Sequence, residues 1–433
     1  MAAVRWTDLR SSWAGLTARG TSFLTAGAVA FGCALVLGQS DLVRVAALLA
    51  VLPVVVVVVM AAQRLHLGVT RSTEPPRGSV GQQVEVHVEV VNRADGRTPV
   101  LLLEDALPPG LVASTRVVLP PLRPRESARV AYRLVAARRG RFAIGPARLV
   151  SVEPFGLVER TWEATSVDEL LVRPVAVELP AVLPVRRSGR GGDSDLGGAG
   201  VAGDADLAVR EYRQGDDLRR VHWPTTARRG ELMVRPDQHP QDHNAVVVLD
   251  ARADAQRGAG DDSSLEALVS AAASVAVHAS EAGQRVVLLG DGQEPAVGSH
   301  DTAHRDVADD DPVEEALDRL AVVRAGGPEL LDDAVEVLPR CAPSTVVALL
   351  GEVSVEDAEL LAGTAREAVR AAVVCDTTSW EELSPGRARL LDQQREAAVG
   401  RLGDAGWRVA VWRRGEPLGE VWERLGAGAG VLA

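Results

Sequence analysis

Two long apolar runs stand near the start of the chain. Residues 21–38 carry no charge, and residues 42–62 include an unbroken series of valines at 54–59. Each run is close to the roughly 20 residues with which a helix crosses a bilayer. The connection between them is too short for a domain, and Pro53 is tolerable inside a membrane helix. The pattern predicts a helical hairpin within residues 21–63, with the lipid bilayer as its partner.

The arginines around these runs predict their orientation. Both ends of the hairpin are flanked by arginines, at Arg5, Arg10, Arg19, Arg64, Arg71 and Arg77. The turn carries Asp41 and, close by, Arg44, whose long side chain can reach the headgroups. The positive-inside rule therefore predicts a multi-pass protein of the plasma membrane, with residues 1–20 and the body in the cytoplasm. A cleaved signal peptide would lack the second run, and a lipoprotein site at Cys33 would not lie inside a continuing apolar run.

Beyond the hairpin the period of the pattern changes to two. Residues 83–90 alternate strictly between polar and apolar, as a strand with one buried face does. Further strands are predicted at 100–103, 116–119, 128–135, 147–152 and 169–172, separated by Gly- and Pro-containing breakers. Many short strands divided by turn signals predict an all-β, immunoglobulin-like sandwich over residues 70–180.

From residue 241 onward, apolar strands alternate with amphipathic helices. Strands are predicted at 245–249, 285–289, 345–350, 371–374 and 407–412, and helices at 263–282, 312–323 and 328–337. Ser354 with Asp357, and Ser379 with Glu382, have the spacing of helix-capping pairs and predict two more helices. This order is typical of a parallel, doubly wound sheet, so residues 241–433 are predicted to form an α/β domain. The fold class is multi-domain.

Two segments of unusual composition join these domains. Residues 181–209 are rich in Gly, Asp and Ser and predict a flexible linker. Residues 210–240 follow, and their start, VREYRQGDDLRRVHWPTTARRGELMVRP, combines aromatics, a Gly-Asp turn and many arginines. Asp216 can accept from Arg219 or from backbone N–H groups, and an arginine can stack on Trp223. A structural clasp onto the next domain and a ligand site are both compatible with this composition.

The distribution of charge and the cysteine content limit the classes of partner and site that the chain can have. The chain has no lysine, a bias that resembles the codon usage of a GC-rich bacterial genome. Residues 1–240 hold 30 Arg against 24 Asp plus Glu, and residues 241–433 hold 17 against 35. The acidic second part argues against nucleic acid and suits a basic partner. Three scattered cysteines, Cys33, Cys341 and Cys375, predict neither a disulfide framework nor a metal site.

Two motifs resemble a known family. The stretch RRGRFAIGPARLVSVEPFGL at 138–157 is similar to the pattern that closes the β-domain in the bacterial domain-of-unknown-function fifty-eight family, with Glu153 in place of the usual Asp. The second segment resembles the central signature of that family, with His222 in place of an Asp. Its matching residues, the candidate interaction site, are Arg210, Tyr212, Gly215, Asp216, Arg219, Trp223 and Arg228.

The resemblance implies a von Willebrand factor A-like C-terminal domain. In such domains a divalent ion is held at the end of the first strand by Asp-x-Ser-x-Ser. Here the positions are occupied by Asp250, Arg252 and Asp254, so both hydroxyls are lost and a fixed cation stands where the metal would lie. Asp291 and Glu352 follow other strands but do not restore the triad. The expectation is a degenerate site with no metal and no cofactor.

The family also implies partners. Its members are commonly encoded beside MoxR-type AAA+ ATPases and transglutaminase-like membrane proteins, which implies a non-enzymatic, membrane-anchored adaptor or scaffold in envelope-related assembly or stress. The alternative is a metal-dependent, ligand-binding von Willebrand factor A receptor, against which the lost serines argue. A hydrolase that pairs His222 with Thr225 or Thr226 lacks a nucleophile elbow and is rejected.

Overall fold

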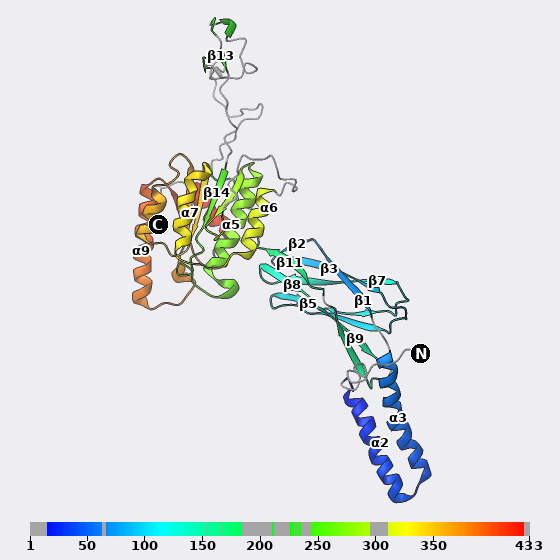
Figure 1. The fold of residues 1–433 in the computed structure, drawn as a ribbon. Helices are drawn as coiled ribbons and strands as arrows, with labels where there is room; N and C mark the ends of the chain where they lie inside the picture. Colours follow the sequence, from blue (N-terminus) through cyan, green and yellow to red (C-terminus); the bar gives the residue numbers. More distant parts are fainter. Residues whose placement is uncertain are drawn as a thin grey trace. The chain divides into compact units, whose positions relative to one another are not determined.

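The computed structural model divides the chain into two units (Figure 1). The first contains Met1–Val175 and Leu317–Val323, and the second contains Ala176–Ala316 and Arg324–Ala433. The structure describes residues 15–62, 66–153, 155–164, 166–183, 210–211, 226–228, 230–231, 233–234, 244–294 and 311–427. The predicted linker 181–209 falls outside these residues from 184 onward.

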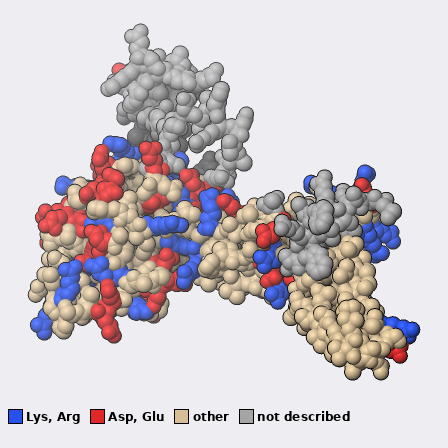
Figure 2. Space-filling model, turned by 60° about the horizontal axis from the view of Figure 1, so that its bottom comes forward, with Lys and Arg blue, Asp and Glu red and all other residues tan. Residues whose placement is uncertain are grey.

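The predicted hairpin is a pair of packed helices, α2 (Ala18–Leu37) and α3 (Ser40–Ala62). Thr17 caps α2 by accepting from the N–H of Gly20, and Gly38, with φ of 65°, ends it. Both helices are long and apolar enough to cross a membrane, by length and composition. Figure 2 shows a largely uncharged face of the hairpin, and at the start of α3 Arg44 pairs with Asp41 at 2.8 Å.

Three antiparallel or mixed sheets complete the first unit. One has the order β1 (Leu67–Glu74), β3 (Gln83–Asn92), β7 (Ser127–Ala136) and β5 (Leu111–Ala113). The second has the order β10 (Glu159–Glu163), β9 (Ala147–Val152), β4 (Leu101–Asp105) and β6 (Arg116–Leu119). The third has the order β2 (Arg77–Ser79), β11 (Asp168–Arg173) and β8 (Gly140–Ile144). All three contribute to one hydrophobic core, as the predicted alternation requires.

A buried ion pair crosses this core. The Arg71 side chain of β1 and the Asp105 side chain of β4 have no solvent exposure, and an Nη2–Oδ1 distance of 2.7 Å joins them. Tyr132 of β7 donates to Asp105 at 2.8 Å, and Arg71 also reaches Asp168 at 3.1 Å. Burial, followed by the charge of Asp105, raises the pKa of Tyr132, which keeps its hydroxyl protonated as a donor. The network ties strands of different sheets together.

The second unit contains a five-stranded parallel sheet with strand order β15-β14-β16-β17-β18. Its strands are β14 (Asn244–Leu249), β15 (Arg285–Leu289), β16 (Pro343–Leu350), β17 (Val369–Cys375) and β18 (Arg408–Trp412). The helices between and after these strands are α5 (Ser264–Glu281), α6 (Pro312–Val322), α7 (Glu329–Val337), α8 (Val355–Ala362), α9 (Pro385–Asp404) and α10 (Leu418–Gly426). Residues 317–322 of α6 are counted in the first unit. The short 3₁₀ helices are η2 (Gly260–Asp262), η3 (Leu338–Cys341) and η4 (Thr377–Ser379). The predicted doubly wound arrangement is therefore present, in the order 2-1-3-4-5 along the chain.

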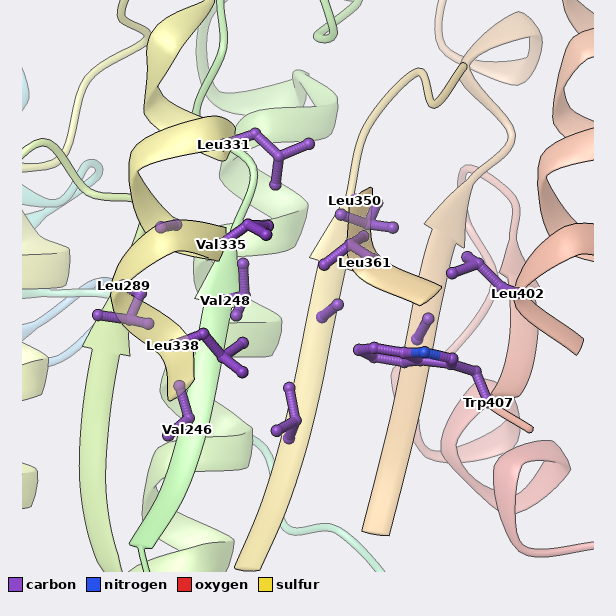
Figure 3. Close-up of a cluster of buried hydrophobic side chains, with 14 of the residues drawn as sticks. Val246, Val248, Leu289, Leu331, Val335, Leu338, Leu350, Leu361, Leu402 and Trp407 are labelled. Carbon is purple, nitrogen blue, oxygen red and sulfur yellow. The ribbon is translucent and has the colours of Figure 1, made fainter. Parts of the chain in front are cut away.

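The core on one face of this sheet explains the continuous apolar strands. Valines of β14 and leucines of neighbouring strands meet side chains from α7, η3, α8 and α9, with Trp407 beside them (Figure 3). A parallel sheet covered on both faces has no polar side, so its strands lack the alternation seen in the first unit.

One predicted helix start is wrong. Ser379 and Glu382 do not begin a helix, because Ser379 ends η4 and α9 begins only at Pro385, with Ser384 at its N-cap position. The Ser379 hydroxyl donates to the carbonyl of Asp376 at 2.6 Å, so it closes a local turn instead. By contrast, Ser354 and Asp357 form the predicted reciprocal capping box at the start of α8.

Candidate functional site

The strongest concentration of buried charge in the second unit lies at the carboxyl edge of its sheet. Strands β14, β15, β16, β17 and β18 are followed, directly or after one glycine, by Asp250, Asp291, Glu352, Asp376 and Arg413. In a parallel sheet these ends share one edge, and the strand order reverses between β14 and β16. Doubly wound domains bind ligands in the crevice at that point.

Asp250 is fully buried beside this switch point. Its Oδ1 accepts from the Arg252 Nε at 2.8 Å and its Oδ2 from the Arg252 Nη2 at 3.0 Å, a bidentate pair. The backbone N–H of Arg252 donates to Oδ1 at 3.2 Å, and that of Gly351 to Oδ2 at 3.3 Å. Both carboxylate oxygens are thus occupied by groups of the protein itself.

The Arg252 guanidinium also donates hydrogen bonds to a second carboxylate. Its Nη1 and Nη2 donate to the Asp357 oxygens at 2.9 and 3.2 Å. Burial alone would lower the pKa of Arg252, but hydrogen bonds and charge from Asp250 and then Asp357 raise it above its ordinary value. The guanidinium is a permanent positive charge between two carboxylates. Asp357 therefore serves both the cap of α8 and this cluster.

The loop that follows β14 is hydrogen-bonded to the loop that follows β16. Gln256 donates its side-chain N–H to the carbonyl of Asp250 at 2.6 Å, and the N–H of Glu352 donates to the carbonyl of Ala255 at 2.7 Å. A β-carbon on Gly351 would lie 2.3 Å from the Ala255 oxygen, so only glycine allows this approach. The loops that follow β14 and β16 are therefore held against each other at the switch point of the sheet.

Further ion pairs extend along the same edge. Glu352 accepts from Arg257 at 2.6 Å and lies 3.7 Å from Arg387. Asp376, which is 6% exposed, pairs with Arg395 at 2.6 Å and with Arg413 at 3.3 Å. These acidic strand ends are thus neutralised by arginines from the loops and helices around them.

This arrangement does not fit a divalent ion. Within the described residues, His, Cys, Asp and Glu side chains form no group of three or more that could hold a metal. Asp254, the third position of the degenerate motif, is exposed, and its backbone carbonyl accepts from Arg257 at 2.9 Å. The sequence predicts a fixed cation at Arg252, whereas its bidentate pairing with Asp250 and its contact with Asp357 come from the structure. The absence of metal binding in solution remains a prediction.

The predicted signature site is described only at its ends. Arg210–Glu211 (β12) pairs antiparallel with Met233–Val234 (β13), and the N–H of Met233 donates to the hydroxyl of Thr226 at 3.0 Å. Arg228 lies in a helical turn and is exposed. The remaining signature residues fall outside the described part of the chain: Tyr212, Gly215, Asp216, Arg219 and Trp223.

The Glu-Pro-Phe-Gly-Leu motif has a definite structural role in the first unit. The Glu153 carboxylate accepts from the backbone N–H groups of Phe155, at 2.6 Å, and Leu157. The carbonyl of Leu157 accepts from the N–H of Thr17 at 3.0 Å, and a β-carbon on Gly20 would lie 2.3 Å from the same oxygen. The motif is a turn that joins the β-sheets to the start of α2.

The same turn also packs on α3. Leu157, the last residue of the motif, and Val158, which follows it, are buried against Val56, Val57 and Met60. Arg160 adds a hydrogen bond to the carbonyl of Met60 at 2.7 Å, near the end of α3. The sequence singled out the motif but did not indicate that the hairpin is its partner.

Residues 208–397 match the family model described as "Protein of unknown function DUF58", which agrees with the resemblance seen in the sequence motifs. The chain is 27% identical over 161 residues to the uncharacterized protein YeaD of Bacillus subtilis, over 35% of this chain and 39% of that protein. The chain thus spans well under two thirds of that relative.

Solved structures resemble the chain only weakly. The Caenorhabditis elegans protein WR4, a member of the MSP family, is 10% identical with a TM-score of 0.16, over 24% of this chain and 96% of its own. The PapD-like domain 7 of human CEP192 is 10% identical with a TM-score of 0.17, over 26% of this chain and 87% of its own. Similarities at this level carry no argument about fold or function.

Proposed function

We propose that the protein is a non-enzymatic adaptor or scaffold anchored in the plasma membrane by α2 and α3. Its body faces the cytoplasm and works with a MoxR-type AAA+ ATPase, together with other membrane proteins, in envelope-related assembly or stress. The observation that carries this proposal is the Asp250–Arg252–Asp357 cluster, in which the oxygens of Asp250 are already engaged by the protein itself. A domain in which an arginine occupies the ion position would bind a partner through its protein surface rather than through a bound ion.

The family resemblance supports the finer structural assignment. We propose that the β-sheets form an immunoglobulin-like sandwich and that the second unit is a von Willebrand factor A-like domain with a degenerate metal site. On this assignment, Arg252 replaces the divalent ion as a tethered counter-charge for Asp250. The competing metal-dependent receptor would need free ligand positions on Asp250, and both of its oxygens are engaged.

An acidic helix surface suits a basic partner. On α7, four carboxylates are exposed on the side away from the buried Leu331, Ala334 and Val335: Glu329, Asp332, Asp333 and Glu336. Like-charged side chains on one helix face raise the rate at which the protein associates with an oppositely charged surface. Salt weakens this electrostatic attraction. We propose this α7 face as a contact for the ATPase.

The proposal is tested by co-purification from detergent-solubilised membranes with the ATPase, with and without ATP. The pair Asp332→Asn and Asp333→Asn should lower ATPase recovery several-fold at physiological salt. The matched pair Glu396→Gln and Asp404→Asn, equally exposed on α9, should leave recovery unchanged. A companion pair, Asp216→Ala with Trp223→Ala, tests the signature segment. No ATP-dependent recovery with the unmodified protein, or EDTA-sensitive capture of another ligand, would contradict the adaptor function.

A further inference from the structure

The turn at Glu153–Leu157 presents an aromatic side chain to solvent. Phe155 is 60% exposed, although it stands in a turn whose other apolar residue, Leu157, is buried. The turn is held by the Glu153 carboxylate and by Gly156, whose φ of 67° places it in the left-handed region. A fixed turn that exposes a large apolar ring indicates a contact surface rather than a fold requirement.

The position of this turn along α3 indicates which environment surrounds the Phe155 ring. Leu157 and Val158 pack on Val56 and Val57, and Val56 lies about 9 Å from the end of α3 at a rise of 1.5 Å per residue. On neighbouring positions of the same helix, Val58 and Val59 are 44% and 54% exposed. A bilayer that covers these valines therefore reaches the level of the turn.

The polar side chains around the turn fit the same boundary. Arg19 is exposed, and a β-carbon on Gly156 would lie 3.3 Å from its Nη1. Arg160 lies over the ring of Trp162 with 5.0 Å from Cζ to the ring centroid. Arginines that reach for phosphates and aromatic rings at headgroup depth are typical of membrane interfaces.

We propose that the Glu153–Leu157 turn is a membrane-interface anchor. Phe155 inserts into the boundary between headgroups and hydrocarbon, and Arg19 meets the lipid phosphates beside it. The partner is the phospholipid bilayer itself. This inference rests on the membrane anchoring in the proposed function and adds a third point of contact, from the β-sheets, to the two helices.

The test measures the depth of three spin-labelled cysteines in the full chain, reconstituted in phosphatidylethanolamine–phosphatidylglycerol vesicles. The variants Val29→Cys, Phe155→Cys and Val112→Cys are made in a Cys33→Ala background. They are matched controls, because the native side chains are 66%, 60% and 67% exposed and lie on α2, the turn and β5. Collision with oxygen reports lipid, and collision with a water-soluble nickel chelate reports water.

We expect the ratio of oxygen to nickel collisions at Phe155 to exceed that at Val112 several-fold and to approach that at Val29. A Phe155 label as accessible to nickel as the Val112 label, with the Val29 label in lipid, would overturn the interface anchor alone. A Val29 label accessible to nickel would show that the hairpin is not in the bilayer, and the proposed function would fail with it.

Discussion

Arg252 is the residue around which the buried charges at the edge of the parallel sheet are arranged. Its guanidinium lies between Asp250, at the end of β14, and Asp357, in the first turn of α8. The family resemblance, together with the spacing of residues 250 to 254, predicts an arginine in place of an ion, and the structure shows Arg252 paired with Asp250. The second carboxylate could not be predicted, because residues 252 and 357 are distant in the sequence and Asp357 was already explained as a helix cap.

Removal of this guanidinium should destabilise the protein strongly. Arg252→Met leaves the buried Asp250 without a counter-charge, and breaking a buried pair in this way costs about 3–5 kcal/mol. Urea unfolding of the detergent-solubilised chain, followed by tryptophan fluorescence, measures the loss. Arg414→Gln, which removes an exposed pair with Asp262, should cost less than about 1 kcal/mol. Equal losses from the two variants would contradict the buried role of Arg252.

The same contacts predict that the protein binds no Mg²⁺ or Mn²⁺ at this edge. A metal would have to displace a bidentate guanidinium from Asp250, together with the N–H of Gly351. Calorimetric titration with Mn²⁺ should show no saturable binding that EDTA reverses. Micromolar binding that disappears in Asp250→Asn would refute this prediction.

The cysteines of the second unit should resist thiol reagents. Burial, followed by the charges of Asp250 and Asp376, raises the pKa of Cys375, and burial raises that of Cys341. A raised pKa keeps the thiol protonated to higher pH, and the thiolate is the reactive form. Maleimide treatment at pH 8 followed by mass spectrometry should modify both residues only after denaturation. Modification of Cys375 in the native protein would contradict its burial.

At the scale of elements, strands with a regular alternation of polar and apolar residues were predictable from the sequence. Strands in which a charged side chain points into the core, or in which no side chain is buried, were not. Strand β3, with four fully buried valines, was predicted almost to its ends. Strand β1 was missed because the charged Arg71 follows the apolar Val69 on the face that enters the core. Strand β10, ERTWE, was missed because it has no buried position. A sequence pattern reports burial of apolar groups and is silent where a paired charge takes their place.

The turn formed by Glu153 should depend on its charge. Glu153→Gln keeps the size of the side chain but leaves one carbonyl oxygen for the two N–H groups of Phe155 and Leu157. We expect faster amide hydrogen exchange at 155–158 and at Thr17, which donates to Leu157. Glu163→Gln, which removes an exposed pair with Arg148, should leave exchange there unchanged. Unaltered exchange in both variants would show that the carboxylate does not hold the turn.

At the scale of the whole molecule, changes in the period of the hydrophobic pattern predicted the order of the segments along the chain. An apolar hairpin, a segment of period two and an alternation of strands and helices follow one another as predicted. The strand order 2-1-3-4-5 was not predictable, because equally apolar parallel strands do not specify their neighbours. The contact between the loops after β14 and β16 likewise depends on Gly351 and Gln256, which no pattern singles out.

The distribution of arginines yields a prediction about the side of the membrane on which the body lies. Arg19 lies in the first turn of α2 and Arg71 and Arg77 follow α3, whereas the hairpin tip carries only the Asp41–Arg44 pair, whose charges cancel. Because arginine-rich flanks are retained in the cytoplasm, both units should be sheltered from outside. Protease added to intact spheroplasts should leave a C-terminal epitope on the full-length chain, and the same protease should remove the epitope in inside-out vesicles. Loss of the epitope from intact spheroplasts would place the body outside and exclude a cytoplasmic ATPase as its partner.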